Sequence, residues 1–259
     1  GPYAKIPAHD MATQAYAGIL SVNLGADGQP GIPGIANADM LTSMMGLSAV
    51  LMALYRRRDT GRGDYIDMAM MDSVIAAMPN NMGPVFAEKR PPNPKDERSW
   101  GGNAMYAIYK TKDDKHIVLG GAEMHFAAAI LNKMGRPDLI DVCLPPPGRN
   151  QDPAKEFLTE TFLSETQAYW VDWFEGVDAA FAPVNNLRQG ADDPQARHRE
   201  MIIEDDRGWE HIGIPMKFRD EPGQVVFDLP DLGQHTETNL RNVGYSEAEV
   251  AAMKDKGVF

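Results

Sequence analysis

The stretch ANADMLTSMMGLSAVLMALYRRR, residues 36–58, does most to define the fold of this chain. Its apolar side chains recur at the three- and four-residue spacing of an α-helix. This spacing predicts a helix from Ala36 to Tyr55 that is buried on much of its circumference. Three arginines precede Gly61, and cations suit a helix carboxyl end, so the helix should end there. The apolar positions are Met40, Leu41, Met44, Met45, Leu47, Leu51 and Leu54.

The residues after this helix predict a strand, a second helix and a linker. Side chains alternate between apolar and polar from Tyr65 to Met70, as in a short strand. Asp72 can cap a helix that continues through Met78. Residues 79–99 are rich in Pro, Asn, Lys and Arg, and this composition predicts a link between two folding units.

The second half of the chain begins with a predicted β-hairpin. Residues 104–109 and 116–119 have strand patterns and are joined across Lys112–Lys115. Near the end, Ser246 and Glu249 have the spacing of a capping box, which predicts a last helix ending before a glycine. Strands and helices interleave throughout, so we expect an α/β protein. Between these two features we expect helices at 123–134, 154–163 and 166–175, a strand at 181–184 and a β-rich stretch at 201–218.

The composition indicates which classes of partner and which cellular compartment to expect. The 259 residues include 37 acidic and 25 basic side chains, for a formal charge of −12. Such a chain should repel nucleic acid and anionic membrane surfaces. No unbroken apolar run approaches the roughly 20 residues of a membrane span. Cys143 is the single cysteine, and no secretory signal is visible, so we expect a cytoplasmic protein without a cysteine-based metal site.

Asp39 is the first candidate for chemistry. It follows a loop rich in glycine and proline and opens the long helix, where free N–H groups and the helix dipole stabilise an anion. One interpretation is ordinary helix capping. The other is nucleophilic attack by the carboxylate on an acyl thioester, which gives an acyl-enzyme anhydride. The local sequence is compatible with both.

Two further ionisable residues are candidates. His9, next to Asp10, is an imidazole beside an acid, the pair that proton abstraction near neutral pH requires. Adjacent helical residues point about 100° apart, so Asp10 need not orient His9. Glu123 follows two glycines at a strand end, where a ligand can approach closely. For each residue a purely structural role is the alternative.

The chain as a whole resembles the class III CoA-transferases, also called the CaiB/BaiF family, which includes formyl-CoA transferases and α-methylacyl-CoA racemases. The resemblance runs from residue 1 to the carboxyl terminus, in six stretches that keep the family's order. They are GPYAKIPAHDMATQAYAGILSV (1–22), GIANADM (34–40), RRRDTGRGDYIDMAMMDSV (56–74), GGNAMYAIYKTKDDKHIVLGGAE (101–123), APVNNLRQGADDPQAR (182–197) and DLGQHTETNLRNVGYSEAEV (231–250).

This resemblance implies a CoA-transferase with Asp39 as its nucleophile. The aspartate would attack an acyl-CoA to form a mixed anhydride and then an aspartyl-CoA thioester, which passes CoA to an acceptor carboxylic acid. Coenzyme A is then a substrate, and no tightly bound cofactor or metal is implied. The family's CoA contacts fall on Lys5, Ile6, Pro7, Ala8 and His9, and its substrate loop falls near Gly101, Gly102 and Asn103.

The racemase branch of the family is the main alternative. There a histidine partnered with the aspartate faces a glutamate, and His9, Asp39 and Glu123 match these positions. Formyl-CoA transferases instead have tyrosine at the position of His9 and a four-glycine loop that is absent here. The contexts GIANADM and DMAMMDS resemble the general transferases, so CoA transfer is favoured.

Domain organisation is also implied by the resemblance. Residues 1–80 would belong to a Rossmann-like large domain, 81–99 would be the linker, 100–183 a smaller α+β domain, and 184–259 a segment returning to the large domain. The family's amino-terminal βαβ half would precede residue 1, so we expect a fragment or a partner that supplies that half. A catalytically incomplete remnant with an assembly role is a further alternative. An interlocked homodimer is expected.

Overall fold

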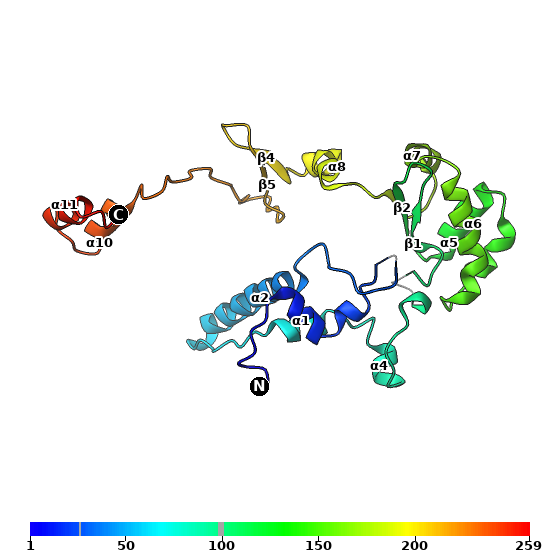
Figure 1. Ribbon diagram of the computed structural model, residues 1–259, viewed down its shortest axis with the longest axis horizontal. Coiled ribbons are helices and arrows are strands. Elements are labelled where there is room, and N and C mark those ends of the chain that lie inside the picture. Colours follow the sequence, from blue (N-terminus) through cyan, green and yellow to red (C-terminus); the bar gives the residue numbers. More distant parts are fainter. Residues whose placement is uncertain (26, 98–100) are drawn as a thin grey trace. The chain divides into compact units, whose positions relative to one another are not determined.

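The computed structural model describes residues 1–25, 27–97 and 101–259. The chain divides into two compact units, Gly1–Val184 and Asn185–Phe259 (Figure 1). Every strand pair in the two small sheets of the described residues is antiparallel. The predicted mixture of helices and strands is confirmed, but these sheets are not the parallel sheet of a Rossmann-like domain.

Short helices around one long helix form the first part of unit 1. A small apolar core of Ala38, Val74 and Met78 lies among these elements. Gln14, fully buried, lies on the first helix of this group. The elements are α1 (Asp10–Tyr16), η1 (Ile19–Ser21), α2 (Asn37–Thr60), α3 (Met70–Ala76), α4 (Gly83–Ala87) and η2 (Pro94–Asp96).

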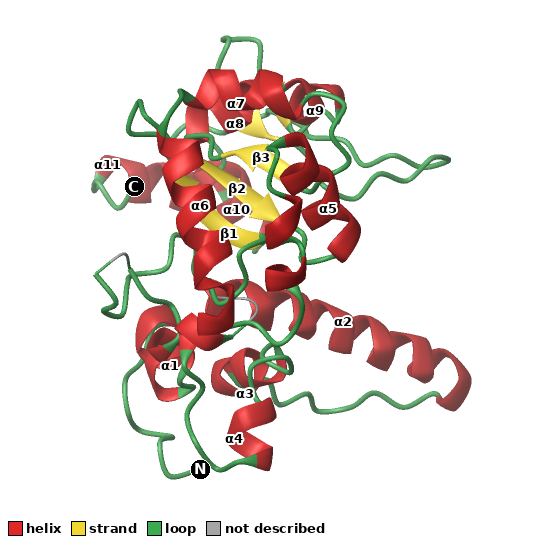
Figure 2. Ribbon diagram, turned by 90° about the vertical axis from the view of Figure 1, so that its right-hand side faces the viewer, coloured by secondary structure: helices red, strands yellow, loops and turns green. Residues whose placement is uncertain are grey.

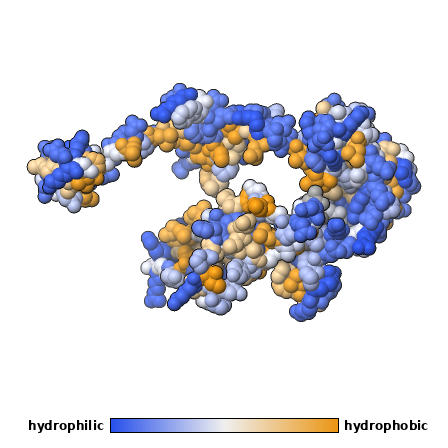
Figure 3. Space-filling view, in the orientation of Figure 1, coloured by the Kyte–Doolittle hydropathy of each residue, from blue (hydrophilic) through white to orange (hydrophobic). Residues whose placement is uncertain are grey.

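Helix α2 confirms the predicted helix but not its burial. It ends at Gly61, whose left-handed conformation (φ 68°) suits a glycine cap. Only Ala38 is buried, whereas Met44 is 64% and Leu51 57% exposed. Helices α1 and α3 contact α2, but no described segment covers most of its apolar length, which shows as exposed apolar surface in Figure 3. The prediction of a buried helix was therefore wrong for this chain by itself.

The same helix has the length and composition of a membrane span. An 18-residue window reaches a mean hydropathy of 1.4 over the 24 residues of α2. Core helices of soluble proteins meet the same criterion, because both environments select apolar side chains. The expectation that the protein has no membrane contact stays a prediction.

Two local predictions around residue 70 were wrong. Residues 62–69 form no strand, because no described strand pairs with them. Asp72 lies inside the first turn of α3, which begins at Met70, and Ala69 is the N-cap residue. Asp72 therefore does not cap this helix, and no side-chain hydrogen bond caps it.

A three-stranded sheet with helices on one face forms the rest of unit 1 (Figure 2). The predicted hairpin is confirmed as β1 (Tyr106–Lys110) and β2 (His116–Gly120), and β3 (Phe181–Pro183) joins β2. Their buried side chains pack in one core with aromatic residues such as Phe162 and Trp170. The helices are α5 (Met124–Lys133), α6 (Asp152–Leu163) and α7 (Gln167–Phe174), with the short turns η4 (Pro137–Leu139), η5 (Asp141–Cys143) and η6 (Arg149–Gln151).

The predicted linker is partly structured. It contains α4 and η2, although its composition suggested irregular chain. Residues 98–100, where the expected linker meets the expected small domain, lie outside the described residues. The boundary between the 1–80 and 100–183 segments therefore stays a prediction.

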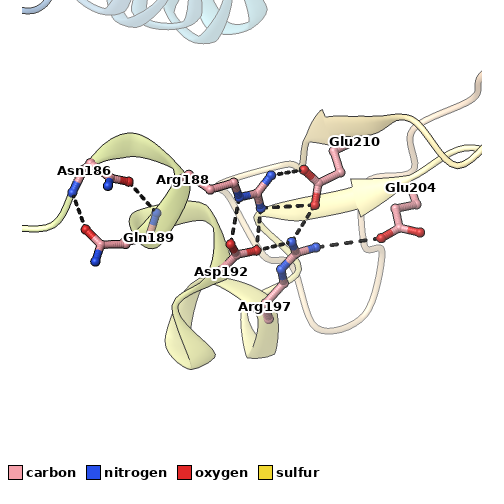
Figure 4. A network of polar contacts seen from close by, with 7 residues as sticks. All are labelled: Asn186, Arg188, Gln189, Asp192, Arg197, Glu204 and Glu210. Atoms are coloured by element: carbon pink, nitrogen blue, oxygen red, sulfur yellow. Dashed lines mark hydrogen bonds and ion pairs between the residues drawn. The ribbon is translucent and has the colours of Figure 1, made fainter.

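Unit 2 begins with two short helices beside a two-stranded hairpin. The elements are α8 (Leu187–Asp192), α9 (Pro194–His198), β4 (Ile202–Glu204) and β5 (Glu210–Ile212). Arg188 and Arg197 both pair with Asp192 and Glu210, and this network joins the helices to the hairpin (Figure 4). The predicted β-rich stretch at 201–218 is thus a short hairpin.

Two helices, α10 (Thr236–Asn242) and α11 (Glu247–Asp255), lie at the end of unit 2. The predicted capping box is confirmed, because the Ser246 side chain accepts from the Glu249 N–H and the Glu249 side chain accepts from the Ser246 N–H. Gly257 follows in a left-handed conformation (φ 65°). Local sequence alone was enough to place this helix.

Candidate active site

The amino-terminal ends of α1 and α2 meet at Asp10. Its Oδ1 accepts hydrogen bonds from the backbone N–H groups of Ala38 (2.7 Å) and Asp39 (3.2 Å). Its Oδ2 accepts from Nε2 of Gln14 at 2.7 Å. Asn37 in turn donates to Oε1 of Gln14 at 3.3 Å. Since the first turn of a helix has no internal partners for its N–H groups, Asp10 caps α2 from a different helix.

Asp39 is held by its backbone while its carboxylate is exposed. It lies in the first turn of α2, and its carbonyl accepts from the Ser43 hydroxyl at 2.8 Å. Among the described residues, no hydrogen bond or ion pair engages the Asp39 carboxylate. Ala36 is the N-cap residue and contributes no side-chain bond. The capping interpretation of Asp39 is therefore wrong, and the helix end favours an anion whose oxygens remain open to a ligand.

His9 stands at the start of α1, one residue from Asp10. It is exposed, it is the N-cap residue of α1, and its carbonyl accepts from the Thr13 N–H at 3.0 Å. The side chain of Asp10 accepts from Ala38, Asp39 and Gln14, and no hydrogen bond among the described residues joins it to the His9 ring. The residues before it, Lys5 to Ala8, are exposed, and the Ile6 N–H closes a turn by donating to the Tyr3 carbonyl at 2.9 Å.

Glu123 occupies the N-cap position of α5 without a side-chain capping bond. It is exposed, and in the described parts of the chain nothing hydrogen-bonds its carboxylate or joins it to His9 or Asp39. The preceding Gly121 has a packing role, since a Cβ there would lie 2.5 Å from the Phe126 ring. Close packing, and not ligand approach, explains that glycine.

The expected substrate loop at Gly101–Asn103 has strong structural requirements. A Cβ on Gly102 would lie 2.5 Å from the Glu97 carbonyl oxygen. Asn103 is 5% exposed, and its Oδ1 accepts from the Met105 N–H at 2.8 Å. Gly101, in contrast, lines a hollow of about 440 Å³ on the open face of the sheet. Packing alone therefore explains the identity of Gly102 and the orientation of Asn103.

Sequence reasoning missed the contribution of Asp10. It treated this residue only as a neighbour of His9, although its partners lie 28 and 29 positions away. Nothing in the local sequence identifies Asp10 as this partner, because Asn37 and Asp39 are themselves residue types that cap helices. No group of three or more His, Cys, Asp or Glu residues in the described ranges is placed to hold a metal ion.

Cys143 is not a candidate nucleophile. It is buried, and its Sγ lies 3.5 Å from the Leu139 carbonyl oxygen. Burial raises the pKa of this thiol to about 11. Because the thiolate is the reactive form, the side chain stays inert at neutral pH.

The model of CoA-transferase family III matches residues 1–236. The chain belongs to that family. It is 26% identical to succinyl-CoA:glutarate CoA-transferase of Mus musculus, over its whole length and 61% of the relative. It is 27% identical to alpha-methylacyl-CoA racemase of Mus musculus, over 98% of the chain and 67% of the relative. Succinyl-CoA--L-malate CoA-transferase beta subunit of Chloroflexus aurantiacus is 26% identical over the whole chain and 67% of that relative.

Solved structures agree on the fold. A CaiB/BaiF family protein from Brucella suis has a TM-score of 0.73 and 23% identity, covering 94% of this chain and 65% of its own. A point mutant of the protein Rv3272 from Mycobacterium tuberculosis has a TM-score of 0.74 and 19% identity, with 95% and 65% covered. The chain spans about 61% of the succinyl-CoA:glutarate CoA-transferase that it matches.

Proposed function

We propose that the whole protein is an acyl-CoA-dependent CoA-transferase that moves CoA between carboxylic acids, with Asp39 as its nucleophile. The observation that carries this proposal is the exposed carboxylate of Asp39 on a backbone that Asp10 anchors. An enzyme nucleophile has to be fixed in place and open to its substrate. The transferases among the relatives support the choice of reaction.

The proposed reaction consists of balanced exchanges at carbonyl carbons. An Asp39 oxygen attacks the thioester carbon, the C–S bond breaks, and CoA thiolate leaves a mixed anhydride. The thiolate then attacks the aspartyl carbonyl, which releases the first carboxylic acid as its anion and leaves aspartyl-CoA. The acceptor carboxylate reverses these two steps, which gives the new acyl-CoA and restores Asp39.

Racemisation next to the thioester is the second candidate. Two observations support it as the alternative. One is the similarity to alpha-methylacyl-CoA racemase, and the other is the exposure of His9, which leaves the imidazole open to a substrate proton. In that reaction His9, assisted by Asp39, and Glu123 would exchange the proton on the α-carbon from opposite sides. The homodimer and the cytoplasmic location remain proposals.

One assay separates the two reactions. The full-length protein is incubated in D₂O with succinyl-CoA and either glutarate or L-malate, and separately with an α-methylacyl-CoA. Transfer predicts a new acyl-CoA from the acceptor and no deuterium on the α-carbon. Deuterium on the α-carbon without transfer would favour the racemase. If neither product forms with a panel of acceptor acids and acyl-CoA donors, both reactions are contradicted. That result would favour a remnant with an assembly role.

Two variants sharpen this assay. Asp39→Asn should abolish transfer, because an amide is a poor nucleophile, while His9→Ala should retain a measurable part of it. Racemisation requires both residues, so both variants should then lose deuterium exchange. A full-activity Asp39→Asn enzyme would refute the nucleophilic role.

A further inference from the structure

A second cavity lies in unit 1 at the carboxyl-terminal end of α1. Its volume is about 490 Å³, within the range of small-molecule sites. The wall is largely apolar and is contributed by the residues that follow α1, by η1 and by the segments on both sides of α4. Its main apolar members are Ala17, Val22, Met78, Met82, Val85 and Pro92.

The charged residues that line this cavity are both cationic. They are Lys89 and Arg90, in a chain whose formal charge is −12. Arg90 also donates through Nε to Glu88 at 2.6 Å, but Glu88 is not part of the wall. Lys89 takes part in no ion pair with a described residue. The cavity therefore combines an apolar interior with a positive edge.

Lys89 has an unusual backbone conformation. It follows the end of α4 with a φ of 56°, a left-handed position where glycine is the usual residue. A non-glycine residue in this conformation costs backbone energy. Lys89 is part of the cavity wall, so this turn places a cationic residue at the cavity.

The cavity is separate from the Asp39 site. Asp10 contacts the start of α2, whereas Ala17 and Gly18, at the other end of α1, line the cavity. The 7 residues of α1 separate the two places by about 10 Å, at 1.5 Å per residue. A small ligand in one site does not need to contact the other.

We propose that this cavity binds an amphipathic monocarboxylate with a medium-length aliphatic chain. The hydrocarbon would lie against Val22, Met78 and Met82, where burial of apolar surface drives binding. The carboxylate would accept hydrogen bonds from Lys89 and Arg90, charge-assisted contacts that select an anion over an alcohol. The methionine side chains adapt readily to chains of different shape. This inference stands apart from the proposed transferase reaction.

Calorimetry on the full-length protein tests the proposal with three probes. Octanoate should bind, acetate should not because it lacks a tail, and octan-1-ol should bind more weakly because it lacks the charge. The double variant Lys89→Gln/Arg90→Gln should weaken octanoate about tenfold or more, the effect of one charge-assisted hydrogen bond. It should leave octan-1-ol unchanged. Arg57→Gln/Arg58→Gln, at the far end of α2, is the matched control and should change neither.

A second variant tests the location without removing charge. Val85→Trp places a large side chain in the cavity and should weaken octanoate and octan-1-ol together, with an unchanged circular dichroism spectrum as the check on folding. No octanoate binding by the unmodified protein would overturn the proposal. Octanoate affinity that neither variant changes would overturn it as well, because the ligand would then occupy another site.

Discussion

Oδ1 of Asp10 lies 3.2 Å from the backbone nitrogen of Asp39 and 2.7 Å from that of Ala38. One carboxylate thus anchors the backbone that carries the other. Because Asp10 satisfies the N–H groups at the start of α2, the Asp39 side chain has no capping role. Asp10 therefore has the structural role, and Asp39 has the proposed catalytic role.

Replacing Asp10 should weaken both stability and activity. Asp10→Ala removes three accepted hydrogen bonds and should cost about 1–2 kcal/mol of unfolding free energy, as for a lost N-cap. It should also lower kcat about tenfold or more, because the Asp39 backbone loses its anchor. Urea denaturation and steady-state kinetics measure the two effects.

Asp10→Asn is the matched control, since its amide oxygen can still accept from Ala38 and Asp39. It should retain most of the stability and activity. Equal losses in both variants would show that charge, and not the hydrogen-bond acceptor, matters at this position. No loss in Asp10→Ala would contradict the anchoring role.

Local sequence predicted some elements well and long-range partnerships poorly. The capping box of Ser246 and Glu249 lies within four residues, so its chemistry could be recognised directly. The hairpin at Lys112–Lys115 was found for the same reason. The bond from Asp39 to Asp10 spans 29 residues and depends on how α1 packs against α2, which no periodicity encodes.

The stability of unit 2 at acidic pH should depend on Glu210. Hydrogen bonds from Arg188, and then Arg197, hold the pKa of Glu210 at about 2, below the ordinary 4.5. A lowered folded-state pKa adds stability above about pH 4.5 that is lost as the pH falls through about 2. NMR titration of Glu210 should therefore show a midpoint near 2.

Arg188→Met should move that midpoint back toward the ordinary value, because it removes the largest cause of the shift. It should also make the β4–β5 hairpin less sensitive to acid over the same range. A midpoint of Glu210 near 4.5 in the unmodified protein would mean that the network in Figure 4 does not persist in solution.

Cys143 should be unreactive in the folded protein. Its pKa of about 11 and its burial leave almost no accessible thiolate at pH 8. A thiol-specific reagent such as iodoacetamide should label it only after unfolding in urea. Rapid stoichiometric labelling of the native protein would contradict the packing around η5.

Gly213→Ala should destabilise unit 2. A Cβ at this position would lie 1.9 Å from the Glu200 carbonyl oxygen, so the backbone would have to move. We expect a loss on the order of 2 kcal/mol in thermal unfolding. Gly190→Ala is the control, because nothing lies within 4 Å of its Cβ position in α8. A neutral Gly213→Ala variant would contradict the close approach of these segments.

The burial of α2 marks the other limit of sequence reasoning. Apolar spacing predicted the helix correctly, because that pattern is a property of the segment itself. Burial depends on what covers the helix, and among the described residues α1 and α3 contact it while residues such as Met44 stay exposed. The same spacing cannot distinguish a covered helix from an exposed one.

The most direct test of the central claim is chemical trapping at Asp39. The full-length protein is incubated with an acyl-CoA and hydroxylamine, digested, and its peptides are analysed by mass spectrometry. An aspartyl anhydride or thioester predicts a hydroxamate on Asp39, absent from Asp39→Asn and from a sample without acyl-CoA. Continued CoA transfer with an unmodified Asp39, or with the hydroxamate on another residue, would contradict the account.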